Sequence, residues 1–444
     1  MNQPDDAAPD IVDASVFSPL PIGARDLLPP EVRTRRALTH ALLERFGLWG
    51  YREVAPPLIE YFEVLGRGLG PRDRERCVRF IEAGAAASGA LLALRSDITP
   101  QIARMVAQRV GGTVAADDSL RLCYAATSVR LPEGRHDRAE LHQVGVELVG
   151  DARPSGDAEL IALADEALTA VGLRAHRFDL SHLRVVNDAL QHLGISESRR
   201  RALLDSLARK DRSGVEQQLE RAGVRGRAAQ TFAMLAELHG PPELLEANQA
   251  RIAEIGAGPA VERLRAVVAT VEREYPQARG RLLVDLGEAR GFDYYTGMRM
   301  RVWAPGVGAP VVRGGRYDDL VARYGAQLPA TGLAFDLDAL EQALVAAGSE
   351  VLETELSPAR LVVLSAALTG DAQVRGRAAA VVEAREARAS GLRAWIETKS
   401  DLDTARHQAR RRGARELTWI APGEGEALTQ ERWRWAGPAW ERVG

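Results

Sequence analysis

The most reactive combination of side chains in this chain lies in the stretch ARGFDYYTG, residues 289–297. Arg290 and Asp293 stand beside Tyr294 and Tyr295, so a cation, a carboxylate and two phenols occur together. If the stretch is a strand, its side chains alternate, with Asp293 and Tyr295 on one face and Tyr294 on the other. A strand that only builds a core rarely carries these residues, so they predict the floor of a polar small-molecule pocket. A surface ribbon with charged edge residues explains the composition equally well.

A second candidate segment joins a buried strand, residues 91–95, to a helix that begins near Thr99. Thr99 followed by Pro100 is the pattern of a helix N-cap with proline at the first helical position, so Thr99 could serve only as a cap. Asp97 precedes that cap, and its carboxylate could point into a cleft at the end of the strand.

A third candidate segment, residues 141–149, has the alternating pattern of a strand. Gln143 and Glu147 share one face with only Gly145 between them, which predicts a gap for a polar group of a ligand. A buried carboxylate without a partner costs several kcal/mol, so Glu147 needs a cation or hydrogen-bond donors. The alternative is a solvated sheet face.

The elements that must position these residues form two predicted domains. Residues 19–348 read as a core of strands and helices, interrupted by a helical insertion at about 183–275. Residues 349–358 read as a linker, and residues 359–444 show a β-α-β-α-β pattern that predicts a small α/β domain with a parallel sheet. The pair Pro56–Pro57 sits poorly inside a central strand and favours an edge or an interface.

The composition excludes several classes of function. A net charge of −3, with 46% hydrophobic and 27% charged residues, describes an ordinary globular chain and gives no sign of wholesale nucleic-acid binding. Cys77 and Cys123 are the only cysteines, too few for a disulfide framework or a metal site. No apolar run could span a bilayer, and residues 1–18 lack a secretion signal. We expect a cytoplasmic protein with a short disordered lead (1–18), no metal and no cofactor.

Four stretches in order, ALRSDITPQIARM, LHQVGVELVG, ARGFDYYTG and GGRYDDLVARYG, resemble the histidyl-tRNA synthetase family. The likeness covers nearly the whole chain, and the last two stretches look like the family's histidine-recognition motifs. The resemblance implies an α+β fold of the class II aminoacyl-tRNA synthetase type, in which helices flank an antiparallel sheet. It also implies a helical insertion, a C-terminal α/β domain like an anticodon-binding domain, and a self-dimer formed around Pro56 and Pro57.

The resemblance further implies a histidine-binding pocket. In that pocket Asp97 and Thr99 would meet the ligand's ammonium group, helped by Gln143 and Glu147. Arg290 would meet the carboxylate, for which a planar bidentate donor has suitable geometry. Three phenols would line the imidazole slot. The family pattern has Glu where Asp97 stands, which shortens its reach by one methylene. The predicted histidine-binding residues are Asp97, Thr99, Gln143, Glu147, Arg290, Tyr294, Tyr295 and Tyr317.

Two motifs depart from the synthetase pattern on the nucleotide side. The family's motif 2 has Phe-Arg-x-Glu, whereas here Val129 or Arg130 falls near the Arg position and the Glu is absent. Motif 3 has Gly-Leu-Glu-Arg, whereas here Asp336, Asp338 and Ala339 stand for its Gly, Glu and Arg. Losing one group that stabilises developing charge costs about 10²–10³-fold in rate. Because Asp336 would also repel a triphosphate, we expect no aminoacylation and no catalytic residues.

The family contains the synthetase and also the regulatory subunit of short-form ATP phosphoribosyltransferase. A kept amino-acid pocket beside an altered nucleotide pocket favours the second. It would be a non-catalytic partner of the short catalytic subunit, in a hetero-oligomer for the first step of L-histidine biosynthesis, with L-histidine as a candidate feedback effector. The alternative is a divergent histidyl-tRNA synthetase. The basic run at 406–415 could contact RNA phosphates, although such runs are more often solvated helix faces, so nucleic-acid binding is the weaker expectation.

Overall fold

The computed structural model describes residues 20–83, 89–109, 119–134, 137–288, 294–349, 359–437 and 439–443. The chain divides into two units, Met1–Glu353 and Thr354–Gly444, and each is described by itself. The expected lead at 1–18, nearly all of the expected linker, and Arg290 and Asp293 lie outside the described residues.

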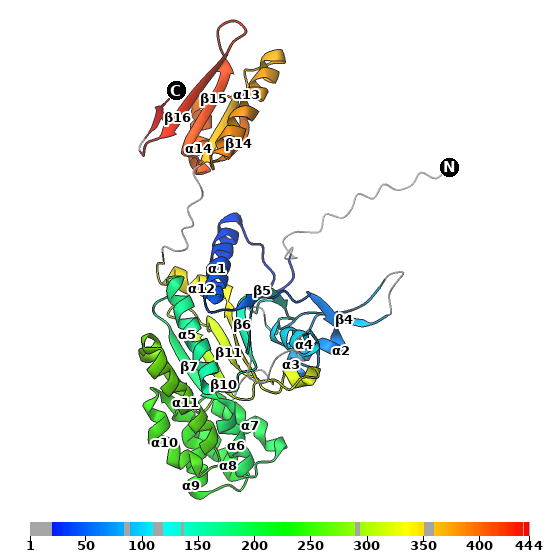
Figure 1. Cartoon of the computed structure of the whole chain (residues 1–444), viewed down its shortest axis with the longest axis vertical. Helices are drawn as coiled ribbons and strands as arrows, with labels where there is room; N and C mark the ends of the chain where they lie inside the picture. The colour runs from blue at the N-terminus through cyan, green and yellow to red at the C-terminus, as the bar shows by residue number, and fades with distance from the viewer. Residues whose placement is uncertain are drawn as a thin grey trace, which may run out of the picture. The chain divides into compact units, whose positions relative to one another are not determined.

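A nine-stranded sheet forms the centre of the first unit, in the order β1-β5-β6-β12-β11-β10-β7-β9-β8 (Figure 1). The sheet is mixed, not wholly antiparallel as expected, because β1–β5 and β7–β9 pair in parallel. Parallel neighbours need long crossover connections, and the chain supplies one before β5 and one between β7 and β9. The strands are β1 (Arg52–Glu53), β5 (Leu120–Val129), β6 (Glu140–Val149), β7 (Arg177–His182), β8 (His239–Gly240), β9 (Leu282–Asp285), β10 (Met298–Trp303), β11 (Val312–Arg316) and β12 (Ala330–Asp336).

One face of this sheet is apolar and packs against helices α1 (Pro29–Leu48), α5 (Pro154–Ala170) and α12 (Leu337–Ala346) (Figure 1). On β6, Val144, Val146 and Leu148 alternate onto this face, and each is fully buried. Helix α1 meets them with Leu42 and Phe46. Burying a side chain of this size is worth about 1.5–3 kcal/mol, so this face carries most of the unit's cohesion.

The opposite face of the sheet carries the polar residues and is partly covered by helix α4 (Thr99–Arg109) and by η3 (Val321–Tyr324). Ile98 and Ile102 pack there against Tyr294 and Tyr317 in a second buried cluster. Alternation along the strands therefore separates an apolar face, which holds the helices, from a polar face, which is free to bind a ligand.

The connection from β7 to β9 is mostly helical and also contributes the short edge strand β8. Its elements are α6 (Leu183–His192), α7 (Glu197–Ala208), α8 (Arg212–Arg221), α9 (Gly226–Met234), η1 (Leu235–Glu237), α10 (Glu243–Ala253), α11 (Gly258–Glu274) and η2 (Pro276–Arg281).

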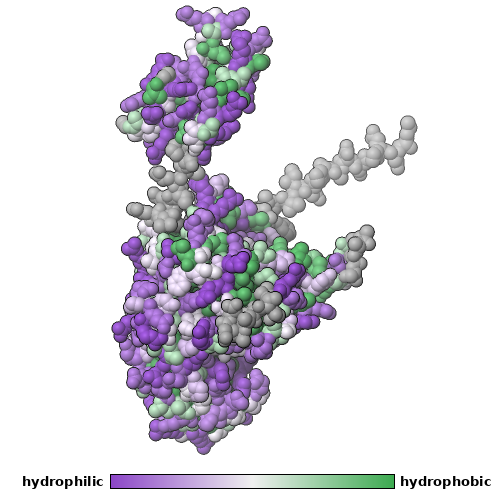
Figure 2. All heavy atoms as spheres, in the orientation of Figure 1, coloured by the Kyte–Doolittle hydropathy of each residue, from purple (hydrophilic) through white to green (hydrophobic). Residues whose placement is uncertain are grey.

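A separate sheet in the order β2-β4-β3 lies beside two short helices. Figure 2 shows apolar side chains at the surface in this part of the first unit. Among them Ile59, Tyr61 and Ile81 are 45%, 53% and 68% exposed. Exposed apolar groups on paired strands are typical of an interaction surface. The elements are β2 (Ile59–Tyr61), α2 (Phe62–Leu65), α3 (Pro71–Glu75), β3 (Arg79–Ile81) and β4 (Leu91–Leu94).

The second unit is a five-stranded sheet in the order β14-β13-β15-β16-β17, with two helices. The three strands expected from the sequence pair in parallel. The Trp-rich end adds two antiparallel strands, so the sheet is mixed. Gly425, at φ +65°, allows the tight turn into β16. The elements are β13 (Ala359–Ser365), α13 (Gly370–Ala389), β14 (Arg393–Lys399), α14 (Leu402–Arg411), β15 (Glu416–Pro422), β16 (Leu428–Trp435) and β17 (Trp440–Arg442).

Within the described ranges, no helix is long and apolar enough to cross a membrane. The same residues contain no group of three or more His, Cys, Asp or Glu side chains placed to hold a metal ion.

Candidate functional site

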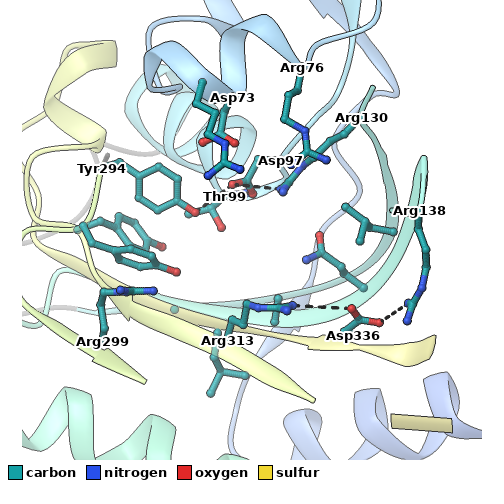
Figure 3. Close-up of a pocket in the computed structure, with 18 of the residues that line it drawn as sticks. Asp73, Arg76, Asp97, Thr99, Arg130, Arg138, Tyr294, Arg299, Arg313 and Asp336 are labelled. Carbon is teal, nitrogen blue, oxygen red and sulfur yellow. Dashed lines mark hydrogen bonds and ion pairs between the residues drawn. The ribbon is translucent and has the colours of Figure 1, made fainter. Parts of the chain in front are cut away.

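A polar cavity of about 530 Å³ opens on the polar face of the large sheet (Figure 3). Its floor comes from β5, β6, β10, β11 and β12, and its walls come from α3, α4 and the segments that follow β5 and precede β10. Six arginines and five carboxylates line it among the described residues. The volume falls within the range of small-molecule sites, and the lining selects a charged ligand.

Glu147 lies directly behind the lining residues Thr99 and Tyr317 and is 1% exposed. It accepts hydrogen bonds from the Thr99 hydroxyl at 2.7 Å and from the Tyr317 hydroxyl. Burial raises the pKa of Glu147 to about 8, and the two hydroxyl donors only partly oppose this shift. The carboxyl group is therefore mostly protonated at neutral pH. It needs no cation, because the Thr99 and Tyr317 hydroxyls are the hydrogen-bond donors that the sequence predicted as one of two solutions.

Asp97 lies beside Glu147 and receives a 3.0 Å hydrogen bond from the hydroxyl of Tyr294. Its other oxygen accepts from the Thr99 backbone N–H at 3.2 Å, at the start of α4. Asp97, not the Thr99 side chain, thus caps this end of the helix, and the Thr99 hydroxyl is free to reach Glu147. Helix capping and pocket formation are shared between neighbours, which the sequence alone could not separate.

The stretch around Tyr294 and Tyr295 corrects the strand expected there. Residues 294–297 form a turn, and β10 begins only at Met298. Both rings therefore line the same cavity, with centroids 4.9 Å apart, whereas a strand would have placed them on opposite faces. Tyr317 meets Tyr294 edge to face at 5.8 Å, which completes an aromatic wall.

The gap expected above Gly145 is filled by a side chain that the sequence analysis did not single out. Tyr124 pairs directly with Gly145 across β5 and β6, and a Cβ on Gly145 would lie 2.5 Å from the Tyr124 ring. The glycine therefore accommodates a protein phenol, not a ligand. Gln143 does line the cavity, and its side-chain oxygen accepts weakly from Ser128 at 3.5 Å.

Two further glycines on the floor serve the same purpose. A Cβ on Gly332 would overlap the Glu147 carboxylate, and one on Gly315 would lie 2.9 Å from the Tyr295 ring. Gly314 and Gly315 lie inside β11, and Gly315 leaves room for the close approach of Tyr295.

The nucleotide side of the cavity differs from the expectation based on motifs 2 and 3. Asp336 caps α12 through the Ala339 N–H at 3.0 Å and pairs with Arg138 at 2.9 Å, so its charge is compensated. Asp338 also pairs with Arg138 at 2.9 Å and is buried beneath it. Arg130, rather than Val129, lines the cavity, 4.0 Å from Asp97. Cations are therefore present here, and simple repulsion of phosphate by Asp336 is not a sufficient description.

Seven of the eight expected histidine-binding residues come together around this cavity, and the eighth, Arg290, lies outside the described residues. Pro56 and Pro57 lie elsewhere, at a surface hollow that they share with Val54, Leu120 and Leu122. The cavity is also lined by four residues that no sequence pattern singled out: Tyr124, Arg138, Arg299 and Arg313. The only available signal was their alternation in strands or their position beside one, and that signal becomes specific only when the register is known.

Aromatic residues of the second unit are covered by its own arginines. The Arg406 guanidinium lies 3.7 Å from the Trp433 ring centroid, and that of Arg410 lies 4.7 Å from Trp435. These are cation–π contacts. They occupy ring faces on which nucleic-acid bases would have to stack.

Comparisons with known proteins match these features. The family model for histidyl-tRNA synthetase matches residues 23–340. An ATP phosphoribosyltransferase regulatory subunit from Moorella thermoacetica is 35% identical over 410 residues, which cover 90% of this chain and 97% of the relative. One from Anaeromyxobacter sp. (strain K) is 39% identical over 327 residues, 73% of this chain and 91% of the relative.

A solved structure from Bacillus halodurans C, described as an ATP phosphoribosyltransferase regulatory subunit/histidyl-tRNA synthetase, has a TM-score of 0.75 and 25% identity. The match covers 92% of this chain and 99% of that one. Together these similarities confirm the expected class II synthetase-like fold, with helices flanking the sheet and a C-terminal α/β domain.

Proposed function

The chain belongs to the histidyl-tRNA synthetase family and, within it, is most similar in the comparisons above to ATP phosphoribosyltransferase regulatory subunits. We propose that it works as such a regulatory subunit. In this role it assembles with a short-form catalytic subunit, in the cytoplasm, for the first step of L-histidine biosynthesis. The observation that carries the proposal is the 410-residue alignment with the Moorella thermoacetica protein, which spans both units of this chain.

The polar cavity supports L-histidine as the effector. Asp97 offers a carboxylate for an ammonium group, and the aromatic wall offers apolar edges for an imidazole. Because the raised pKa of Glu147 keeps it mostly neutral, it holds the Thr99 and Tyr317 hydroxyls at the cavity wall without a desolvated charge. Arg290 is proposed, from the sequence, to bind the carboxylate.

The central experiment is assembly followed by assay. The chain is expressed with a short ATP phosphoribosyltransferase catalytic subunit, the complex is purified through a tag on this chain alone, and phosphoribosyl transfer is measured with and without L-histidine. Co-purification with activity above that of the catalytic subunit alone is expected, and so is inhibition by histidine. Failure to assemble or to stimulate would refute the proposal.

We propose that the chain itself forms no aminoacyl adenylate. The test is histidine-dependent pyrophosphate exchange with ATP and Mg²⁺, with a bona fide histidyl-tRNA synthetase as the positive control. Exchange, or charging of histidine tRNA, would favour the divergent synthetase instead. The C-terminal unit does not decide between the two, since the alignment with the Moorella thermoacetica regulatory subunit extends over 90% of this chain. Its covered Trp faces do not favour RNA.

A self-dimer around Pro56 and Pro57 is part of the proposal. The hollow beside these prolines is lined mainly by apolar side chains, and the sheet β2-β4-β3, which carries exposed apolar residues, begins just after them at Ile59. An Ile81→Glu variant should shift the mass measured by light scattering towards the monomer. Val345→Glu is the matched control, because Val345 is 69% exposed and Ile81 is 68% exposed. An unchanged mass for Ile81→Glu would place the dimer contact elsewhere.

A further inference from the structure

Two arginines on the cavity floor lie farther from carboxylates than the buried Arg316 does; the side chain of Arg299 is 11% exposed and that of Arg313 is 43% exposed. Arg299 lies on β10 and Arg313 on β11, and the pairing of Arg299 with Gly315 puts both side chains on the same face of the sheet. Figure 3 shows both guanidinium groups directed into the cavity, across from Asp97 and Thr99. We call this pair the arginine floor.

Neither guanidinium of the arginine floor donates a hydrogen bond to any residue in the part of the chain that the structure describes. The closest acidic contact of Arg299 is 3.7 Å, from Nη1 to Glu288, and that of Arg313 is 3.8 Å, from Nη1 to Asp336. Arg299 Nη1 is buried without a hydrogen-bond partner. By comparison, Arg316 on the other face binds Asp157 at 2.9–3.0 Å.

The neighbouring carboxylates are already engaged. Glu288 contacts Arg301 more closely than it contacts Arg299. Asp336 accepts from Arg138 at 2.9 Å and from the Ala339 N–H at 3.0 Å. Burial also lowers the pKa of Arg299 below its ordinary value, with Glu288 only partly opposing this. The buried guanidinium of Arg299 would be stabilised most by a carboxylate or phosphate, whose oxygens accept hydrogen bonds from two of its N–H groups.

We propose that Arg299 and Arg313 form an anion-binding subsite in the cavity, which receives a carboxylate or phosphate group of a small molecule. The facing wall holds the Asp97 carboxylate, with Arg130 4.0 Å from it, so a ligand whose anionic group lies on the floor can direct an amine towards Asp97 (Figure 3). The inference rests on the proposed function only in naming histidine as one source of the carboxylate. The cavity volume, about 530 Å³, also leaves room for a second small ligand.

The test is titration calorimetry at constant ionic strength on the full chain with three probes. They are L-histidine, L-histidinol, which lacks the carboxylate, and inorganic pyrophosphate. The variants are Arg299→Gln and Arg313→Gln. Arg225→Gln is the matched control, since Arg225 is 78% exposed and its ion pair with Glu220 is long, at 4.0 Å. Loss of a charge-assisted hydrogen bond predicts roughly a tenfold or greater loss of affinity.

The outcomes separate the two sources of the anion. Weaker histidine binding in both floor variants, with histidinol binding unchanged, assigns the subsite to the amino-acid carboxylate. Weaker pyrophosphate binding, with histidine binding kept, assigns it to a phosphate. Unchanged binding of both anions, or no anion binding by the wild type, overturns the subsite. Anion binding through these arginines in a chain that fails to assemble with the catalytic subunit would refute the proposed function and leave the subsite intact.

A structural role is tested by thermal unfolding without ligand. Removing a poorly paired cation should leave the melting temperature equal to or above that of the wild type. A fall of several degrees in both variants would show that the arginines serve the fold and would count against the subsite. Arg299→Lys keeps the charge without the planar fork and provides a folded comparison if Arg299→Gln does not accumulate.

Discussion

Two regions of the same cavity are built on different principles. On the phenol side, which comprises Asp97, Thr99, Glu147, Tyr294 and Tyr317, the polar groups are linked by hydrogen bonds within the protein. On the arginine floor, the nearest carboxylates stay 3.7–3.8 Å away. The phenol side is already satisfied and selects a ligand by shape and by replacement of hydrogen bonds. Among the described residues, the arginine floor has these long ion pairs and the contact of Arg299 with the Tyr295 ring, so an anionic ligand would compensate its charge more fully. The two regions should therefore respond differently to substitution.

The largest expected effect is the difference in unfolding free energy between substitution of Arg316, which is closely paired, and substitution of Arg299 on the arginine floor. Arg316→Met removes the bidentate partner of the buried Asp157 carboxylate, which keeps only Arg263 at 3.1 Å among the described residues, so the loss should approach the value of about 3–5 kcal/mol for a broken buried pair. Arg299→Met removes a cation that makes no hydrogen bond to a described residue and should cost close to nothing. Chemical denaturation of both variants measures the contrast. Equal destabilisation would mean that the floor is paired as firmly as the core.

The next effect concerns which arginine holds the ligand carboxylate. Arg290→Ala should weaken histidine binding by about 1.5–3 kcal/mol if Arg290 provides a charge-assisted contact. The measurement is calorimetry beside Arg299→Gln. A loss in Arg290→Ala alone would leave the floor to another anion, whereas a loss in both would mean that they share the carboxylate. An unchanged affinity in Arg290→Ala would remove that residue from the site.

Close packing on the phenol side gives a third prediction. Gly332→Ala places a Cβ 1.6 Å from the Glu147 carboxylate and 2.8 Å from the Val146 carbonyl. Overpacking of this kind costs about 1–3 kcal/mol of folding free energy, and it should also displace Glu147 from Thr99. Gly280→Ala is the control, because nothing lies within 4 Å of its Cβ position. A drop in denaturation midpoint for Gly332→Ala alone is expected, and equal midpoints would contradict the packing.

A pH dependence carried by Glu147 gives the fourth prediction. Its pKa is about 8 in the folded state and 4.5 ordinarily, so the folded state binds the extra proton and wild-type stability falls as pH rises between these values. The slope is about 1.4 kcal/mol per pH unit for one such group. Glu147→Gln mimics the protonated form and should lose this slope, so its advantage in melting temperature over the wild type should grow from pH 5 to pH 8. Parallel profiles would show that Glu147 is ionised in the fold.

The sequence by itself determined which side chains share one face of a strand and which buried groups need hydrogen-bond partners. Period-two alternation placed Gln143 and Glu147 on one face and Val144, Val146 and Leu148 on the other, because alternation is a local property of an extended chain. It also determined that Glu147 requires donors, since that follows from the cost of a buried carboxylate.

Tertiary structure alone decided how these faces are filled. Tyr124 covers Gly145 because β5 and β6 pair in one register, and a shift of one residue would have left the gap that the sequence suggested. Arg138 neutralises Asp336 from 198 residues away in the chain. Arg299 and Arg313 become neighbours only through the pairing of β10 with β11. Alternation is a local property, but register and long-range charge pairing depend on segments far apart in the sequence. The arginine floor could therefore be identified only once the pairing of the strands was known.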